Sequence, residues 1–310
     1  MKQYLVFDLG GTSIKYALIS ETAEILEHGK TDAVTDSLDH LLDLLGSVGR
    51  TYEGRYEGAA VSMPGRISTA KGIAFTGGAY RFIRDIPIAD LLEKRLGVPV
   101  TIANDGKCAA NAEAWNGALS GIQNGAVIIL GTGTGGGILL NGKIWMGTSG
   151  GGGELSHLVT DINAFSEAGF SLKNNIEAMW VGHASATGLI GKYAIRKNQP
   201  FLGNSYDGIS LFEAYDAGDP DAWAALEDFG LKTAAGIYSI QSVLDLERYA
   251  VGGGISARRE VTDMIRVKVN ELFGRSANLP FMAPEIVPCR YGNDANLIGA
   301  LRFHLDRITQ

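Results

Sequence analysis

The chain has 310 residues, of which 45% are hydrophobic and 20% charged, and its formal net charge is -7. These values are ordinary for a soluble globular protein, and the dispersed lysines and arginines argue against a nucleic-acid binder. Two cysteines are too few for a disulfide framework. The first apolar run is short and ends in an acid, and no run approaches membrane-spanning length, so we expect a cytoplasmic enzyme with two domains.

The N-terminus has the pattern of a strand, a glycine turn and a second strand. An apolar run at 4–7 leads into the turn at 8–12, and 13–19 resumes with rough alternation. Glycine backbones can approach a phosphate closely, and an acid at the turn suits magnesium, which takes carboxylate, water and phosphate oxygens. We therefore predict a phosphate loop of Gly10, Gly11 and Thr12, with Asp8 holding magnesium through water. A turn-forming Asp8 is the alternative, and Lys15 either reaches a phosphate or faces solvent.

Strand and helix patterns alternate between residues 24 and 119. We expect strands at 24–27, 58–63 and 98–103, and helices at 36–48, 88–96 and 106–119. The strand at 98–103 delivers Asn104 and Asp105 to its carboxyl end, where ligands bind in open α/β sheets. Asp105 is therefore well placed for chemistry. Its alternative role is the N-cap of the alanine-rich helix that follows, and one residue can do both.

A second glycine-rich hairpin follows at 127–145. The apolar run 127–130 enters a glycine and threonine turn, and Asn141-Gly142 between two apolar runs is the strongest short hairpin signal. The match of 131–136 to G-x-G-x-x-G does not indicate a dinucleotide fold, because no helix follows. Successive N–H groups can form an anion-binding nest. We predict that this loop holds phosphates, a plain β-bend being the alternative, through Gly131, Thr132, Gly133, Thr134 and Gly135.

The rest of the chain predicts a second α/β domain. We expect helices at 174–180, 187–193, 219–244 and 294–305, and strands at 248–251 and 286–287. Asp219 and Pro220 are the N-cap and first-turn proline of the longest helix. The predicted domains are 1–120, joined by the C-terminal helix 294–310, and 121–293.

Several motifs occur in the order seen in ROK-family sugar kinases, which belong to the hexokinase, Hsp70 and actin superfamily. They are the turn at 8–12, Asn104-Asp105, the glycine loop at 131–137 and Gly153-Glu154-x-x-His157. Residues 246–256, with Gly253 and Gly254, resemble the second nucleotide-site strand of that family. The resemblance runs nearly end to end. It implies an α/β fold of two ribonuclease-H-like (actin/hexokinase-type) domains with a central cleft, ATP across both glycine loops, and a homodimer.

The resemblance also implies roles for particular residues. Asp105 matches the general base, which agrees with the need for a carboxylate that takes the proton of a sugar hydroxyl. The remaining demands of phosphoryl transfer are positioning and charge neutralisation by metal and N–H donors. The sugar-binding positions are matched by Asn104, Glu154, His157 and Glu177. The alternatives are a helix-start acid for Glu154 and a satisfied buried histidine for His157.

Two stretches depart from the family pattern. Many members bind zinc with the histidine and a cysteine-rich run, whereas 161–175 contains no cysteine, so we predict no structural zinc. At 76–82 many relatives place an asparagine against the sugar. Here Gly77, Gly78 and Ala79 look roomier, which suggests a bulkier substrate such as a β-glucoside or an N-acetylated hexosamine.

Three other function classes were weighed. A ROK transcriptional repressor needs an N-terminal helix-turn-helix, but the first strand begins at residue 4. A hydrolase could use Ser149 in the G-x-S-x-G match at 147–151, but the strand and helix of a nucleophile elbow are not predicted around it. A non-catalytic sugar or nucleotide sensor is disfavoured by Asp105 and both glycine loops. We therefore expect an ATP- and magnesium-dependent kinase for the 6-hydroxyl of a glucose-like hexose, with N-acetylmannosamine or β-glucosides as alternative substrates.

Overall fold

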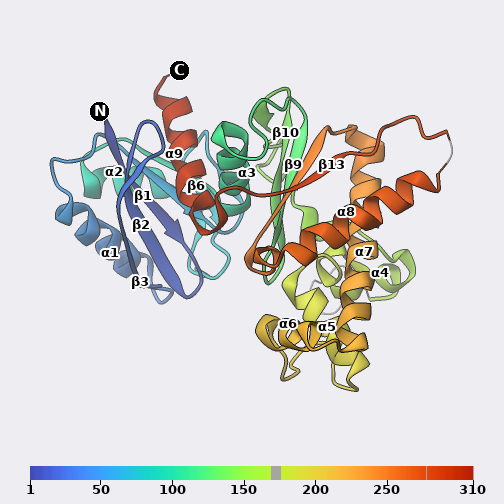
Figure 1. The fold of residues 1–310 in the computed structure, drawn as a ribbon. Coiled ribbons are helices and arrows are strands. Elements are labelled where there is room, and N and C mark those ends of the chain that lie inside the picture. Colours follow the sequence, from blue (N-terminus) through green and yellow to red (C-terminus); the bar gives the residue numbers. More distant parts are fainter. Residues whose placement is uncertain (169–175, 277, 310) are drawn as a thin grey trace. The chain divides into compact units, whose positions relative to one another are not determined.

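The computed structural model describes residues 1–168, 176–276 and 278–309, and the chain divides into two compact units (Figure 1). Unit 1 comprises Met1–Ser120, Ile144–Gly153 and Asn293–Gln310, and unit 2 comprises Gly121–Lys143 and Glu154–Gly292. The division differs from the predicted one in a single internal segment, because Ile144–Gly153 belongs to unit 1. Strands and helices are mixed in both units, so the predicted α/β class is confirmed.

Unit 1 is built on a five-stranded sheet in the order β3-β2-β1-β4-β8. β1 pairs antiparallel with β2 and parallel with β4, and β4 pairs parallel with β8. A second sheet of three short strands has the order β5-β6-β7. The strands are β1 (Gln3–Leu9), β2 (Ser13–Ser20), β3 (Ile25–Asp32), β4 (Ala59–Met63), β5 (Ile67–Ser68), β6 (Ile73–Thr76), β7 (Arg84–Ile86) and β8 (Val100–Asn104).

Helices cover both faces of this sheet, because alternate residues of a strand point to opposite sides. Leu5 and Phe7 of β1 pack in a core with α1 (Leu38–Thr51) and α2 (Ile88–Leu96). Tyr4 and Val6 pack on the other side with α3 (Asp105–Asn116) and α9 (Ala295–Ile308). Helix α2 has its predicted bounds and ends at Gly97 in the left-handed conformation, with φ 71°.

Unit 2 repeats the plan with a five-stranded sheet in the order β11-β10-β9-β12-β13. The hairpin of β9 (Gly125–Leu130) and β10 (Thr134–Leu140) is antiparallel, and β12 (Arg248–Gly252) lies parallel to both β9 and β13 (Glu285–Pro288). β11 (Lys143–Ile144) forms one edge of this sheet, and β13 forms the other. The core joins the sheet to α5 (Ala186–Arg196), α6 (Gly208–Asp216), α7 (Pro220–Leu244) and α8 (Arg259–Gly274).

Most predicted elements of unit 2 are present, and one is wrong. Asp219 caps α7 by accepting a hydrogen bond from the Asp221 N–H, and Pro220 opens the helix as predicted. The helix expected at 174–180 is not continuous: Ile176–Ala178 and Trp180–Gly182 are two short 3-10 turns, and 174–175 lie outside the described residues. Helices α4 (Ile162–Ala168), α6 and α8 were not predicted. Within the described ranges, every helix is too short or too polar to cross a lipid bilayer.

Candidate functional site

The turn between β1 and β2 brings the N-terminal motif into a tight loop in unit 1. The Gly10 N–H donates to the Ser13 carbonyl at 3.0 Å, and the Thr12 carbonyl accepts from the Ala33 N–H at 3.1 Å. A Cβ at Gly10 would lie 2.7 Å from the Ser13 carbonyl oxygen, so only glycine fits this close approach. Lys15 follows on β2, where its ammonium donates to the Asn293 carbonyl at 3.2 Å.

Tyr80 contacts this loop through a hydrogen bond to Gly10. Sequence reasoning did not identify Tyr80 as part of the site. Its hydroxyl donates to the Gly10 carbonyl at 2.7 Å, and its side chain is fully buried. Burial, together with the nearby charge of Asp8, raises the pKa of Tyr80 to about 12, so the hydroxyl remains a donor at neutral pH. An aromatic residue just after two turn glycines was the available signal, but nothing local identified its partner.

The glycines beside Tyr80 have a role in the turn itself. A Cβ at Gly77 would lie 2.7 Å from the Tyr80 carbonyl oxygen. Gly78 has φ +59°, and its Cβ would lie 2.9 Å from the Pro64 side chain. Both positions therefore require glycine for the backbone conformation. That this stretch admits a bulkier sugar stays a prediction.

Asp8 lies at the carboxyl end of β1 and is buried. Its Oδ1 accepts hydrogen bonds from the Ser62 hydroxyl at 2.9 Å and the Asn296 amide at 3.0 Å. Burial raises the pKa of Asp8, while the bonds from Ser62 and Asn296 and the charge of Lys15 oppose that rise. The carboxylate is thus oriented by side chains of β4 and α9, next to the glycine turn between β1 and β2.

Asn104 and Asp105 lie at the carboxyl end of β8, which is separated from β1 by β4. Met63 of β4 is the register partner of Asn104, and Ser62 is that of Asp8, so the two acids stand roughly 10 Å apart, about two strand spacings. Asn104 is the N-cap of α3, its Oδ1 accepting from the Lys107 N–H at 3.1 Å. The alternative that Asp105 is the cap is therefore wrong.

The Asp105 carboxylate is held by two donors of its own. Oδ1 accepts from the Gly106 N–H at 2.8 Å and from the Asn104 amide at 3.0 Å. The same Asn104 amide donates to the Gly65 carbonyl at 3.0 Å. Asp105 is thereby fixed in direction by its neighbours at the first turn of a helix.

Unit 2 presents the second glycine loop at the junction of β9 and β10. The Gly131 N–H donates to the Gly133 carbonyl at 3.0 Å, and Thr134 begins β10. Gly253 has φ +96°, and a Cβ there would lie 2.5 Å from the Leu130 carbonyl oxygen. The backbone of the Gly253–Gly254 motif therefore touches the end of β9. Within unit 2, the structure thus brings the glycine loop at 131–135 close to Gly253 and Gly254, and sequence reasoning assigned both motifs to the nucleotide.

The three sugar-site candidates of unit 2 lie on two segments that run side by side. Glu154 precedes the 3-10 turn Leu155–His157, and all three side chains, Glu154, His157 and Glu177, are exposed. Val159 forms an antiparallel bridge with Met179, and the Trp180 N–H donates to the Leu158 carbonyl at 2.7 Å. The bridge places the segment of Glu177 beside that of Glu154 and His157.

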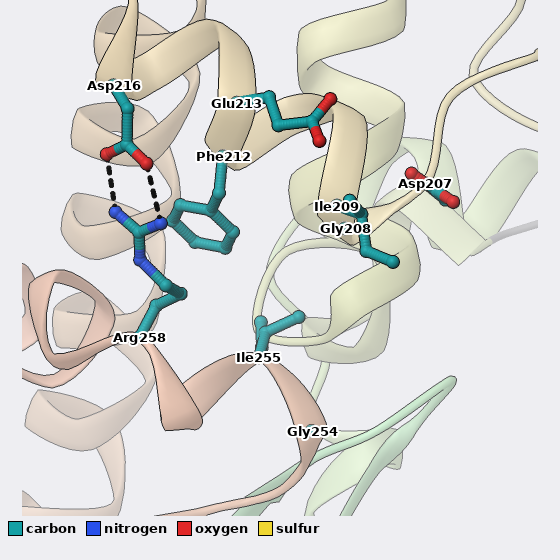
Figure 2. A pocket seen from close by; sticks show the side chains of 9 residues that line it. All are labelled: Asp207, Gly208, Ile209, Phe212, Glu213, Asp216, Gly254, Ile255 and Arg258. Atoms are coloured by element: carbon teal, nitrogen blue, oxygen red, sulfur yellow. Dashed lines mark hydrogen bonds and ion pairs between the residues drawn. The ribbon is translucent and has the colours of Figure 1, made fainter.

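A pocket of about 530 Å³ opens beside Gly254 (Figure 2). Ile209, Phe212 and Ile255 give it apolar walls, and Asp207 and Glu213 add carboxylates. Its lining comes from α6 and from the turn between β12 and α8. Sequence reasoning missed this pocket apart from Gly254, because α6 and α8 were not predicted.

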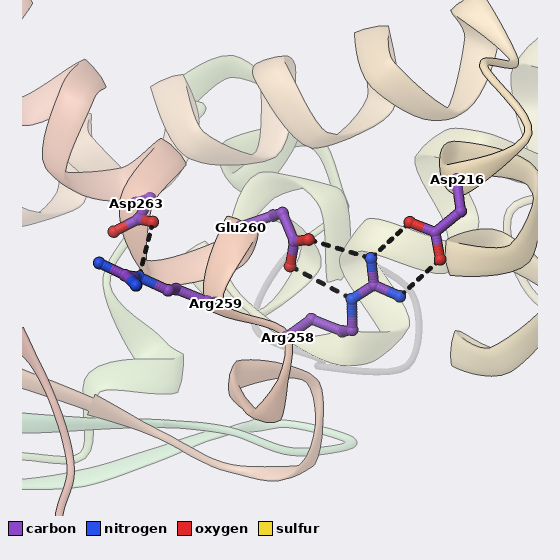
Figure 3. Close-up of polar contacts among 5 residues, drawn as sticks. All are labelled: Asp216, Arg258, Arg259, Glu260 and Asp263. Atoms are coloured by element: carbon purple, nitrogen blue, oxygen red, sulfur yellow. Dashed lines mark hydrogen bonds and ion pairs between the residues drawn. The ribbon is translucent and has the colours of Figure 1, made fainter.

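Arg258 closes one side of the pocket as part of a charged cluster (Figure 3). Its guanidinium donates two hydrogen bonds to Asp216, at 2.6 and 2.9 Å, and two to Glu260, at 3.1 and 3.2 Å. It also lies 4.8 Å from the centre of the Phe212 ring. The guanidinium lowers the pKa of both carboxyl groups, so the cluster stays ionised and joins α6 to the start of α8.

Two further features concern nucleophile and metal chemistry, namely the segment around Ser149 and the clustering of metal-binding side chains. Neither the strand before Ser149 nor the helix after it that a nucleophile elbow requires is present in the described segment 145–154. In the described ranges, no group of three or more His, Cys, Asp or Glu side chains could hold a metal ion. Part of the stretch 161–175, on which the prediction of no structural zinc depends, lies outside those ranges.

Comparison with known proteins places this arrangement in a family. The ROK family model matches residues 4–307. A beta-glucoside kinase of Klebsiella pneumoniae is 28% identical over 303 residues, which are 97% of this chain and 95% of that protein. A ROK family protein from Streptococcus pneumoniae, solved in complex with sucrose, has a TM-score of 0.84 at 26% identity and covers 99% of this chain and 100% of its own.

A ROK family glucokinase from Streptomyces griseus was solved in complex with glucose and AMPPNP. It has a TM-score of 0.79 at 25% identity and covers 96% of this chain and 98% of its own. The family model spans nearly the whole chain, and these folds match across both units. The chain belongs to the ROK family.

Proposed function

We propose that this protein is a sugar kinase that transfers the γ-phosphoryl group of ATP to the 6-hydroxyl of a glucose-like hexose. The observation that carries the proposal is the arrangement at the carboxyl ends of β1, β4 and β8. There a buried Asp8 at the end of β1 and an oriented Asp105 just after β8 stand at the same edge of the sheet, with β4 between them, beside a glycine loop. The relatives named as sugar kinases support the reaction class.

Asp105 takes the proton of the attacking hydroxyl in this proposal. A sugar hydroxyl is a poor nucleophile, and a carboxylate within hydrogen-bond reach removes its proton as the phosphoryl group arrives. The Gly106 N–H and the Asn104 amide both bind Oδ1, so the carboxylate is oriented before the substrate arrives. Asn104 adds an amide to the same place, where it can contact the sugar.

Asp8 would hold magnesium through water. One carboxylate, with the remaining ligands supplied by water and phosphate, suits the octahedral oxygen shell of this ion. Ser62 and Asn296 orient the Asp8 carboxylate, and no all-protein cage is needed. When bound, magnesium supplies charge neutralisation at the phosphates.

We infer nucleotide contacts in each unit taken by itself, at the glycine turn of unit 1 and, in unit 2, at the glycine loop and the pocket beside Gly254. Gly11 and Thr12 in unit 1, and Thr132 and Gly133 in unit 2, would supply backbone N–H groups. The N–H groups of Gly10, Gly131 and Thr134 donate within the protein, so these residues would shape the two turns, and Gly135 continues into β10. The pocket's apolar walls, Ile209, Phe212 and Ile255, suit a planar heterocyclic base. Arg258 would not attract an additional phosphate, because Asp216 and Glu260 already compensate its charge.

Glu154, His157 and Glu177 would bind the hydroxyls of the sugar. Carboxylates accept hydrogen bonds and imidazole both donates and accepts, which is the combination that hydroxyl groups need. The relatives named above are a beta-glucoside kinase and a glucokinase, so β-glucosides belong in the test beside glucose. N-acetylated hexosamines join them because the sequence at 76–82 suggested a bulkier substrate.

The experiment is a measurement of ADP release from ATP and magnesium over a panel of sugars. The panel contains glucose, mannose, fructose, N-acetylglucosamine, N-acetylmannosamine and cellobiose. We expect one sugar to turn over well above the sugar-free rate and its product to carry phosphate at the 6-position. Binding of ATP and sugar without turnover of any member would contradict the proposal and favour a sensor.

A further inference from the structure

Thr134 follows Gly133 in the glycine loop and is the first residue of β10. Several hydrogen bonds within unit 2 involve its backbone and side chain. Its side chain is only 3% exposed. The Thr134 N–H donates to the Ser156 hydroxyl at 3.2 Å, and that hydroxyl donates back to the Thr134 carbonyl at 2.8 Å. One serine therefore satisfies both peptide groups of a residue that water scarcely reaches.

Ser156 lies between two of the sugar-site candidates. It is the middle residue of the turn Leu155–His157, with Glu154 directly before that turn. Leu155 is buried against the same hairpin, since a Cβ at Gly136 would come within 3.2 Å of its side chain. A shift of the glycine loop at Thr134 is thus transmitted directly to the segment that carries Glu154 and His157.

A second set of bonds leads from the glycine loop to the start of α5. The Thr134 hydroxyl donates to the Ala184 carbonyl at 2.6 Å. The Thr187 hydroxyl donates to the Thr132 carbonyl at 2.8 Å, and the Ala186 N–H donates to the Gly131 carbonyl at 2.8 Å. Three hydrogen bonds therefore join Ala184, Ala186 and Thr187 to the loop.

His183 extends this connection to Glu177. Its Nε2 lies 2.8 Å from the Glu177 carbonyl oxygen, which can only accept, so the ring proton is on Nε2. Burial and the charge of Lys192 lower the pKa of His183, so the imidazole is neutral at pH 7. The backbone of Glu177 is thus held by the residue next to Ala184.

We propose that Thr134 and Ser156 couple nucleotide binding to sugar binding, with Ser156 as the positioning residue. The inference depends on the proposed function, because it takes the glycine loop as the phosphate site and Glu154, His157 and Glu177 as sugar ligands. Phosphates that order the loop also order Thr134, and through Ser156 and Ala184 they order both sugar segments. The second ligand then meets a site that is already arranged.

The experiment measures this coupling directly. The dissociation constant of glucose or cellobiose, whichever turns over faster, is determined by calorimetry with and without AMPPNP and magnesium. The ratio of the two constants is the coupling factor. For the wild-type protein we expect about 5- to 150-fold, the usual range for linked sites. For Ser156→Ala we expect a factor at least about fivefold smaller, because a buried peptide group loses its partner.

Control variants separate coupling from general damage. Ser239→Ala removes a hydroxyl that bonds the Ala235 carbonyl on the exposed side of α7, and it should keep the wild-type factor. Ser156→Thr retains the hydroxyl and should restore most of the coupling. If Ser156→Ala does not fold, Thr134→Val is measured instead; it removes the bond to Ala184 and should also lower the factor.

The outcomes are distinguishable from failure of the proposed function. Turnover by the wild-type protein, with an unchanged coupling factor in Ser156→Ala, would overturn this inference and leave the kinase assignment intact. A wild-type factor of one would overturn it as well. A wild-type protein that turns over no sugar would contradict the proposed function, and this inference with it.

Discussion

The hairpin β1–β2 of unit 1 and the hairpin β9–β10 of unit 2 share one plan. In each, an antiparallel pair carries a glycine turn, and the first strand also pairs in parallel with a later strand, β4 or β12. The turns are held differently. Side chains hold the first, through the Tyr80 hydroxyl on Gly10 and the hydrogen bonds to Asp8. The second is held by close backbone packing, where Gly253 touches Leu130, together with bonds from the Ser156 and Thr187 hydroxyls to its backbone.

The two hairpins share one strand arrangement, but different contacts fix their turns. The unit 1 loop stands beside carboxylates whose orientation depends on donors from other elements, as chemistry requires. In the unit 2 loop the conformation depends on a glycine, Gly253, whose missing Cβ lets its backbone contact the end of β9. Substitutions should therefore act on the two loops through different quantities.

The largest effect on turnover is expected at Asp105 of unit 1. Asp105→Asn keeps an oxygen for the Gly106 N–H but cannot take a proton, so kcat should fall about 10²- to 10⁴-fold. The Michaelis constants should change little. Asp90→Asn, in the first turn of α2, is the matched control and should keep wild-type turnover. Steady-state ADP release decides, and unchanged turnover in Asp105→Asn would rule out a general base there.

A glycine substitution tests the backbone packing of unit 2. Gly253→Ala places a Cβ at φ +96° and within 2.5 Å of the Leu130 carbonyl oxygen. The backbone strain alone costs about 1–3 kcal/mol, and the displaced loop should bind ATP more weakly. Gly274→Ala, which meets no neighbour and has ordinary φ, should be nearly neutral. Thermal unfolding and the KM for ATP are the measurements, and equal behaviour of the two variants would refute the packing argument.

Acid should weaken unit 1 through His304, which is buried on α9. Its Nδ1 lies 3.0 Å from the Thr101 hydroxyl, and burial, with a smaller effect of Arg307, lowers its pKa to about 4 from an ordinary value of 6.5. Between these values the unfolded chain binds more protons, so stability falls as pH decreases from 6.5 to 4, by about 3 kcal/mol in full.

Amide hydrogen exchange at pH 7 and pH 5 would locate this loss of stability. Amide exchange is base-catalysed, so the rates are first corrected for the slower intrinsic exchange at pH 5. The resulting protection should decrease in β1, β8 and α9 on acidification, and less so in His304→Gln, which has no imidazole to protonate. His28→Gln, at an exposed position on β3, is the control. The His183 pKa is also lowered in unit 2, so some response is expected there. An identical pH response in His304→Gln and the wild-type protein would exclude His304 as the cause.

The smallest effect is expected at the side-chain support of unit 1. Tyr80→Phe removes only the hydroxyl that donates to the Gly10 carbonyl. A single such bond contributes about 0.5–1.5 kcal/mol, so the KM for ATP should rise about 2- to 12-fold while the KM for sugar stays constant. Tyr238→Phe in the aromatic cluster of unit 2 serves as the control. Equal changes in both Michaelis constants would show that Tyr80 does not act through the phosphate loop.

Much of the fold could be predicted because its signals are local. Gly97 ends α2, and Asp219 with Pro220 begins α7, as their positions in the sequence indicated. Helix α8 was missed although its buried residues recur at helical spacing, because no capping side chain marks its start. The region 176–180 was predicted as part of a helix, yet tertiary contacts with 158–160 hold it in short turns.

The candidate site divides in the same way. The sequence by itself determined the candidate residues and where the chain turns, since the positions of Asp8, Asp105 and the glycines follow from strand ends and turn geometry within a few residues. Only the tertiary structure decided that Tyr80 lies under Gly10, that Gly253 meets Leu130 and that Ser156 binds Thr134. These partners are separated by 22 to 123 positions, so their contacts depend on how the sheets and helices pack, which no short pattern specifies.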